Sequence, residues 1–306
     1  MASSERYFDP KALARIGRLE LRVRTVVEGI ISGLHRSPYN GQSVEFVDHR
    51  EYEPGDDPRH IDWKVLGRAD RIVIKRYEED TNLRGHLLLD ASESMRFGQG
   101  VASRDRLSKY DYAATMAASM GYLLRRQHDA IGISLFDSEI RERVALSTNP
   151  ATLHQVAEAM ERTRPSHKTG LEKVLRQLAD DIPRRGLVVL FSDLFAPLDD
   201  IEAGLRHFVV RRHDIVVFHT LDETELTFPF EGNTLFKGLE DYPEVLVEPR
   251  GLRDAYLEAM GNYLDKVRDI CAELGVDYRL IHNGEPVDVP IISIVSKRAR
   301  LGRRMT

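Results

Sequence analysis

Apolar and polar positions change their spacing in a regular way from about residue 84 onward. Short runs rich in leucine, valine and isoleucine alternate with longer segments whose apolar residues recur every three or four positions. The first pattern is typical of buried strands and the second of amphipathic helices. Strands that alternate with helices favour a mostly parallel sheet with helices on both faces. The pattern therefore predicts an α/β fold of the doubly wound type.

The same spacing locates the individual elements. After a first strand at residues 87–89, we expect strands at 130–136, 187–192, 215–220 and 276–281, an edge strand at 141–146, and helices at 111–127, 151–163, 170–181, 198–211 and 252–274. No regular element is expected beyond residue 281, and the basic cluster at 297–304 is read as a solvated tail or a helix end. Before residue 84, the pattern predicts a helix at 11–34 and strand-like runs at 43–47 and 71–77. We therefore divide the chain into an N-terminal segment, residues 1–83, and a larger domain, residues 84–306.

Oxygen-bearing side chains follow the first buried strand. The apolar run at residues 87–89 ends at Asp90, and Ser92 and Ser94 occupy the next two alternate positions. Open α/β sheets place ligand sites at the carboxyl ends of their strands. One carboxylate and two hydroxyls on a tight loop suit a small divalent cation such as Mg²⁺. Taken alone, the triplet fits equally well a strand that ends in an Asx or serine turn.

Two later segments favour the metal site. A second apolar strand ends at Asp193, and Thr169 stands in the loop or first turn of the helix at 170–181, where its hydroxyl is free to cap or to bind. Aspartate, two serines, a later threonine and a strand-end aspartate form, in that order, the pattern of a metal-ion-dependent adhesion site. From residue 84 onward the chain thus resembles a von Willebrand factor A-type domain.

That resemblance assigns roles to the five residues. It implies that Asp90, Ser92, Ser94 and Thr169 supply direct or near-direct oxygens to Mg²⁺ or Mn²⁺. Asp193 is then expected to hold a coordinating water or to orient a hydroxyl. An open coordination position would accept a carboxylate from a partner protein. Glu93, between the two serines, is a possible competing internal ligand.

A long segment ahead of the larger domain carries a second family resemblance. It reads GQSVEF at residues 41–46 and REYEPGDDPRHIDWK at residues 50–64, and it resembles the domain of unknown function 58 family, whose members join such a segment to an A-type domain. Members typically accompany MoxR-type AAA+ ATPases in chaperone-like assembly or metal insertion, so the resemblance implies such an ATPase and a client protein as partners. Residues 53–64 contain a turn signal, and we expect a structural or docking role for them, with Trp63 as a packed anchor.

Composition limits the other functions. The chain has 306 residues, ample for a core, and a net charge of −5 without an aromatic-interleaved basic stripe, which argues against nucleic acid. No apolar stretch approaches the ~18 residues of a membrane span, and residues 1–10 lack the apolar core of a signal peptide. The single cysteine, Cys271, lies on a helical apolar stripe and fits a reducing compartment. We therefore expect a cytoplasmic protein.

Catalytic alternatives remain open but have less support. An aspartate after a first strand also begins phosphoryl-transfer sites of the haloacid-dehalogenase type, where it is the nucleophile beside Mg²⁺. Such sites usually place a second aspartate two residues later as general acid and base, whereas this chain has Ser92. P-loop, nucleophile-elbow and His-Glu-x-x-His motifs are missing from the sequence. We predict a metal-dependent interaction module that is not an enzyme; a hydrolase using Asp90 and a scaffold with a degenerate ion site are the alternatives.

Overall fold

The computed structural model describes residues 44–52, 63, 65, 67, 72–79, 83–98, 107–239 and 244–304. Its contacts assign Ser32–Asn82 to one compact unit and Leu83–Thr306 to another. The helix expected at residues 11–34 lies outside the described residues. Among the helices that are described, none combines the length and the apolar character needed to cross a membrane.

The smaller unit contains an antiparallel pair of strands. Strand β1 (Val44–Glu51) pairs with β2 (Val73–Glu79), and the register shifts between Phe46 and Asp48. Both strands overlap the runs expected from the sequence. The expectation of a packed anchor at Trp63 is wrong, because this side chain is 64% exposed.

The larger unit is built on a six-stranded sheet. In the order β10-β7-β6-β3-β4-β5, all neighbouring strands are parallel except β5, which pairs antiparallel with β4 at one edge. Counted along the chain, this is the 3-2-1-4-5-6 order of the doubly wound fold, whose switch point lies between the first and fourth strands. The predicted α/β architecture is therefore confirmed. The strands are β3 (Arg84–Asp90), β4 (Ala130–Phe136), β5 (Ile140–Ser147), β6 (Leu187–Ser192), β7 (Asp214–Leu221) and β10 (Asp277–His282).

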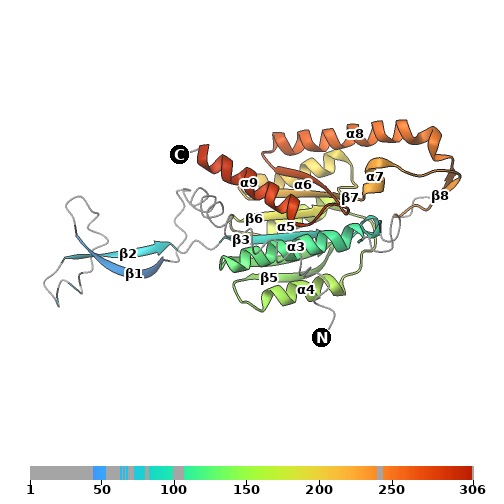
Figure 1. Cartoon of the computed structure of the whole chain (residues 1–306). Coiled ribbons are helices and arrows are strands. Elements are labelled where there is room, and N and C mark those ends of the chain that lie inside the picture. Colours follow the sequence, from blue (N-terminus) through green and yellow to red (C-terminus); the bar gives the residue numbers. More distant parts are fainter. Residues whose placement is uncertain are drawn as a thin grey trace. The chain divides into compact units, whose positions relative to one another are not determined.

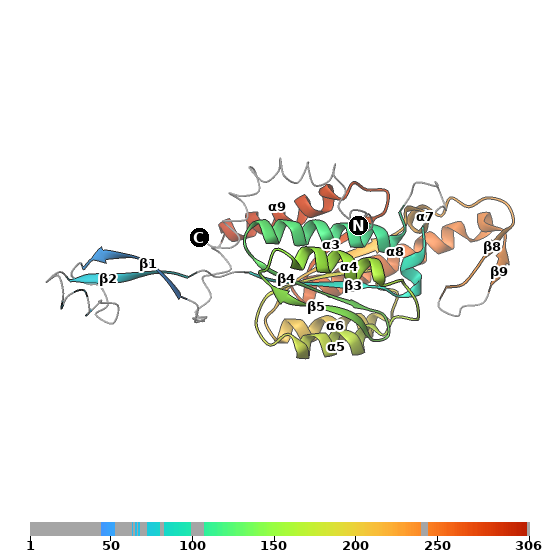
Figure 2. The same ribbon diagram turned by 90° about the horizontal axis from the view of Figure 1, so that it is seen from below.

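Helices cover both faces of this sheet (Figures 1 and 2). Buried residues of α3 (Lys109–Arg126), α4 (Thr152–Arg162) and α9 (Asp288–Arg304) share one core. Those of α5 (Leu171–Asp181), α6 (Leu198–Val210) and α8 (Pro249–Glu273) share the other. The expectation that regular structure ends at residue 281 is wrong, since α9 buries Ile291 and Ile294 at helical spacing.

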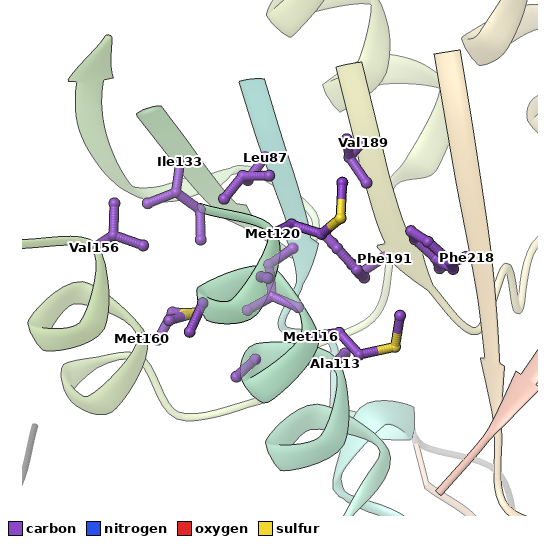
Figure 3. Packing of buried hydrophobic residues seen from close by; sticks show 14 of the residues in the cluster. Leu87, Ala113, Met116, Met120, Ile133, Val156, Met160, Val189, Phe191 and Phe218 are labelled. Atoms are coloured by element: carbon purple, nitrogen blue, oxygen red, sulfur yellow. The ribbon is translucent and has the colours of Figure 1, made fainter. Parts of the chain in front are cut away.

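Residues within each strand alternate between the two cores, because helices cover both faces. Leu87 and Leu89 of β3 belong to the core under α3, whereas Leu88 belongs to the core under α5. Figure 3 shows the first core, where methionines of α3 lie near the aromatic side chains of β6 and β7. The rings of Phe191 and Phe218 stack there with centroids 5.2 Å apart. This double burial fixes where each strand ends, and hence where its terminal polar residues lie.

In the described part of the chain, four short elements were not expected from the sequence. They are a 3₁₀ turn at Glu93–Arg96, helix α7 (Glu223–Thr227), and the hairpin strands β8 (Thr234–Phe236) and β9 (Val245–Val247). The 3₁₀ turn begins shortly after β3, and α7 directly follows β7. Both therefore lie at the carboxyl edge of the sheet, where the candidate site is found.

Candidate metal-ion site

Asp90 lies at the carboxyl end of β3, beside the switch point of the sheet. Its side chain is fully buried. One carboxylate oxygen accepts a 2.8 Å hydrogen bond from the backbone N–H of Ser92, and the other accepts a 2.6 Å bond from the Ser192 hydroxyl. Among the described residues Asp90 makes no ion pair. Burial raises the pKa of this carboxyl to about 7, and the negative charge of Asp193 adds to the effect. Asp90 is thus a well-oriented carboxylate without a counter-charge.

Ser92 and Ser94 place their hydroxyls next to this carboxylate. Both residues are buried, and their Oγ atoms lie 3.1 Å apart. Ser94 also hydrogen-bonds the carboxylate of Asp193. Glu93, the possible competing ligand, pairs with Arg96 at 3.4 Å. The 3₁₀ turn therefore directs the two hydroxyls inward, while the acid between them has a partner of its own.

Thr169 precedes α5 in a loop that contacts the loop after β3. Backbone bonds of 2.9 Å from Ser166 to Ala91 and of 2.8 Å from Glu93 to His167 join the two loops. The Thr169 hydroxyl is buried and has no hydrogen-bond partner among the residues that the structure describes. An unsatisfied buried hydroxyl costs about 1–3 kcal/mol. A threonine hydroxyl left in this state is available to a ligand.

Asp193 follows β6 and has a different electrostatic environment. One oxygen accepts a 2.8 Å hydrogen bond from the Lys109 ammonium, and the other accepts a 3.2 Å bond from the backbone of Phe195. Burial alone would raise the pKa of Asp193, but Lys109 outweighs it and holds this pKa below its ordinary value. Asp193 is therefore ionised and already paired with a cation.

Lys109 was not identified from the sequence. It is buried in the first turn of α3, and its ammonium lies 3.0 Å from Glu225 of α7 as well as next to Asp193. Burial lowers the pKa of Lys109, yet the two carboxylates more than compensate and raise it above its ordinary value. The sequence signal was a lysine in a helix first turn, where the helix dipole disfavours a cation.

His219 holds the loop that carries Asp193. Its Nε2 lies 2.8 Å from the Asp193 carbonyl oxygen, so this nitrogen donates, and its Nδ1 lies 3.0 Å from the Tyr278 hydroxyl. Burial lowers the pKa of His219 to about 4, which keeps the ring neutral near pH 7. The loop also contains Leu194 at a positive φ of 51°. A neutral histidine thus fixes a strained turn beside the candidate site.

Four of the five residues expected at the site are joined by direct interactions. These are Asp90, Ser92, Ser94 and Asp193; Thr169 is linked through its loop. The described residues contain no group of three or more histidine, cysteine, aspartate or glutamate side chains able to hold a metal. The donors are instead hydroxyls and carboxylates, which suit Mg²⁺ or Mn²⁺ rather than a softer ion. The unsatisfied Thr169 hydroxyl and the unpaired Asp90 fit such a cation.

Comparisons with known proteins place this geometry in context. The family described as "Protein of unknown function DUF58" matches residues 48–263. "Uncharacterized protein Mb1516" of Mycobacterium bovis and "Uncharacterized protein Rv1480" of Mycobacterium tuberculosis are each 26% identical over 298 residues, which cover 95% of this chain and 91% of each relative. The similarity to both relatives therefore extends over nearly the whole chain.

Solved structures are similar at a lower level. A conserved hypothetical protein BatB from Bacteroides thetaiotaomicron has 13% identity and a TM-score of 0.44, covering 72% of this chain and 100% of that one. An aerotolerance-related membrane protein from Bacteroides fragilis has 15% identity and a TM-score of 0.47, covering 71% of this chain and 100% of that one.

Proposed function

Because the chain belongs to the family of unknown function DUF58, we propose that it is a metal-ion-dependent protein-interaction module that works with a MoxR-type AAA+ ATPase. In this proposal Asp90, Ser92, Ser94 and Thr169 hold Mg²⁺ or Mn²⁺, and Asp193 holds a coordinating water or orients the Ser94 hydroxyl. The ion would supply positive charge and an open position for a carboxylate of the partner protein. The outcome is assembly or maturation of a protein complex.

The buried Asp90 carboxylate is the observation that carries the proposal. Burying a carboxylate is costly unless a cation or hydrogen bonds compensate for the lost water. Two hydrogen bonds orient Asp90, but no described basic side chain neutralises it. The unsatisfied hydroxyl of Thr169 on the neighbouring loop is a second unmet demand. A small cation would neutralise the Asp90 carboxylate and accept the Thr169 hydroxyl oxygen as a ligand. Mg²⁺ typically uses only one or two carboxylates.

The environment of Asp193 supports the division of roles. Because Lys109 already pairs with Asp193, this aspartate does not require a second cation in direct contact. Asp193 can still accept hydrogen bonds, and it already accepts one from the Ser94 hydroxyl. If Asp193 acts only through a water or a hydroxyl, Asp90 is the one carboxylate of the five proposed site residues that contacts the ion directly, and the ion keeps part of its positive charge. Such an ion attracts a carboxylate from a partner.

One observation favours the scaffold alternative. The Lys109 ammonium is a built-in cation within the same cluster, so a degenerate site that needs no metal is physically reasonable. The hydrolase alternative gains less, since Ser92 hydrogen-bonds Ser94 and supplies no proton-transfer group. We therefore retain the interaction module as the proposal and treat the scaffold as its main competitor. The MoxR-type partner is suggested by the family alone.

Manganese binding followed by electron paramagnetic resonance tests the ion site. We expect Asp90→Asn and Thr169→Val, both close in shape to the native side chains, to weaken Mn²⁺ binding at least tenfold. Asp137→Asn is the matched control, because Asp137 is also fully buried and follows the neighbouring strand β4 but pairs with Arg141. Equal Mn²⁺ affinity in all three variants and the parent would support the scaffold instead.

The partner is tested separately. A purified MoxR-type AAA+ ATPase is mixed with the full chain, and both association and ATP turnover are measured with Mg²⁺ present throughout. We expect association or altered turnover with the parent chain and a clear loss of either effect with Asp90→Asn. Folded, ion-binding protein that shows neither effect would contradict the ATPase part of the proposal while leaving the ion site standing.

A further inference from the structure

A cavity of about 700 Å³ opens beside the candidate ion site. Ser94 and Asp193 line both, so the cavity begins where the ion site ends. Its other walls come from the turn after β3, the loop after β6, the segment after β8, and one face of α8. The large side chains among them are Phe97, Phe195, Leu239, Tyr256, Met260 and Tyr263. The volume and the apolar walls are typical of a ligand pocket.

The polar groups that line the cavity are engaged elsewhere. Tyr263 donates its hydroxyl to the backbone of the loop after β6, and Tyr256 donates to the carbonyl of Glu225 at 3.0 Å. Lys109 is shared between Asp193 and Glu225. Both tyrosines therefore present ring carbons to the cavity. Such walls favour an apolar group over a sugar, a nucleotide or a second ion.

Apolar side chains are also exposed at the rim of the cavity and on the β8–β9 hairpin, whose first strand leads into the lining. Phe195, on the rim, is 54% exposed, and Leu246 of the β8–β9 hairpin is 69% exposed. Leu235 and Val245 of the same hairpin are also exposed. Lys237 to Leu239, which line the cavity, directly follow β8, and the hairpin leads into α8 (Figures 1 and 2). The apolar lining reaches the protein surface at Phe195, and exposed apolar surface of this kind typically marks protein contact, so we place part of the occupant outside the cavity.

We propose that this cavity receives a large apolar side chain from the same partner segment whose carboxylate reaches the ion site. The inference rests on the proposed function and adds its specificity: the partner presents Asp or Glu with Phe, Leu or Met within two residues. The charge pattern agrees, since the proposed ion would attract an anion and the adjoining cavity offers mainly apolar walls. The occupant is a peptide segment, because a small molecule confined to the cavity would leave the hairpin surface exposed.

A selection from random linear peptides displayed on phage tests this specificity. The full chain is immobilised in Mg²⁺ and bound phage are eluted with chelator, which recovers only ion-dependent peptides. We expect an acidic residue with a large apolar neighbour in the recovered sequences. Ala259→Trp, at an exposed α8 position that lines the cavity, should abolish the apolar preference. Ala255→Trp is the matched control on the same helix, since Ala255 is exposed and does not line the cavity.

Affinity measurements complete the test. A fluorescein-labelled peptide from the selection should bind at least tenfold more weakly to Ala259→Trp than to Ala255→Trp, and replacing its apolar residue by alanine should have a similar effect on the parent. Calorimetry with Mg²⁺ shows whether Ala259→Trp has disturbed the ion site itself.

The outcomes separate the two proposals. Chelator-eluted peptides that are acidic but show no apolar preference would overturn the inference and leave the ion site intact. Apolar peptides that resist chelator but are blocked by Ala259→Trp would support the cavity and contradict the ion site. Recovery of no specific peptide would overturn the inference, and the Mn²⁺ binding measurements would then decide the ion site on their own. Dodecanoate binding that Ala259→Trp blocks, without peptide binding, would overturn the peptide segment in favour of a small amphiphile.

Discussion

Replacing Lys109 with methionine removes the ammonium that lies 2.8 Å from Asp193 and 3.0 Å from Glu225. At an effective dielectric constant of about 20, attraction between unit charges over such a distance is about 6 kcal/mol, and desolvation of both ions offsets much of it. Removing one partner of a buried pair keeps the desolvation cost and loses the attraction, which typically destabilises by about 3–5 kcal/mol. We expect Lys109→Met to lower the free energy of unfolding by that amount at pH 7.

Urea denaturation in the presence of chelator is the assay. Lys297→Met is the matched control, because Lys297 pairs with Asp277 at 3.0 Å but its side chain is 53% exposed. Exposed ion pairs contribute at most about 1 kcal/mol, so this variant should unfold almost like the parent. The comparison isolates burial, since both variants remove the same charge from an ion pair of similar length.

Ion binding supplies a second readout on the same variant. Without the Lys109 ammonium, Asp193 has lost its counter-ion, and we expect Mg²⁺ to bind Lys109→Met more tightly and to restore part of the lost stability. Unfolding within about 1 kcal/mol of the parent would refute the buried-pair argument. If Lys109→Met is strongly destabilised and Mg²⁺ does not restore any of its stability, then the ion does not interact with the Asp193 carboxylate that Lys109 neutralises.

Four further substitutions test the rest of the description by denaturation. Trp63→Ala should change stability by no more than about 0.5 kcal/mol, because its ring is exposed; a larger loss would mean the ring is packed. Gly132→Ala should cost about 1–3 kcal/mol, since its Cβ would lie 2.9 Å from the β5 backbone, whereas Gly261→Ala, in open space on α8, should gain about 0.5–1 kcal/mol. Burial lowers the pKa of His86 from 6.5 to about 4, so this side chain binds a proton more weakly in the folded state than in the unfolded state. The free energy of unfolding should therefore fall by about 2 kcal/mol from pH 6.5 to pH 4, a value that allows for the partial exposure of His86. His219, whose pKa burial also lowers to about 4, contributes over the same pH range, so His86→Leu should make that part of the pH profile less steep without removing its slope. An unchanged slope would contradict the assignment.

The regular part of the fold was predictable because its strands are buried on both faces. Uninterrupted apolar runs predict such strands, and β4 and β6 have the bounds expected from the sequence. The edge position of β5 was also expected, but its antiparallel direction comes from the structure alone. Its side chains alternate between partly buried and exposed. Helix α9 was missed because its basic second half obscured the apolar spacing of Val287, Ile291 and Ile294.

The candidate site was predictable only where its residues follow a strand or precede a helix in a recognisable order. Asp90 ends β3 and Asp193 directly follows β6, and that position marks them. Lys109, Glu225 and His219 come from the start of α3, from α7 and from within β7, and nothing in their local sequence relates them to one another. Only the parallel sheet, which gathers the carboxyl ends of β3, β6 and β7 at one edge, brings these charges together.

The contrast between the two aspartates follows from how each is held. Leu194 donates its backbone N–H to the Ser192 hydroxyl at 2.9 Å, and that hydroxyl donates to Asp90, so the loop after β6 orients the carboxylate of β3. Asp90 is therefore preorganised without being neutralised, whereas Asp193 is neutralised by Lys109. A preorganised ligand loses little freedom when it binds, which favours ion binding without rearrangement of the core. Any response of the fold to the ion must then arise at Asp193, where Lys109 links the loop after β6 to α3 and α7.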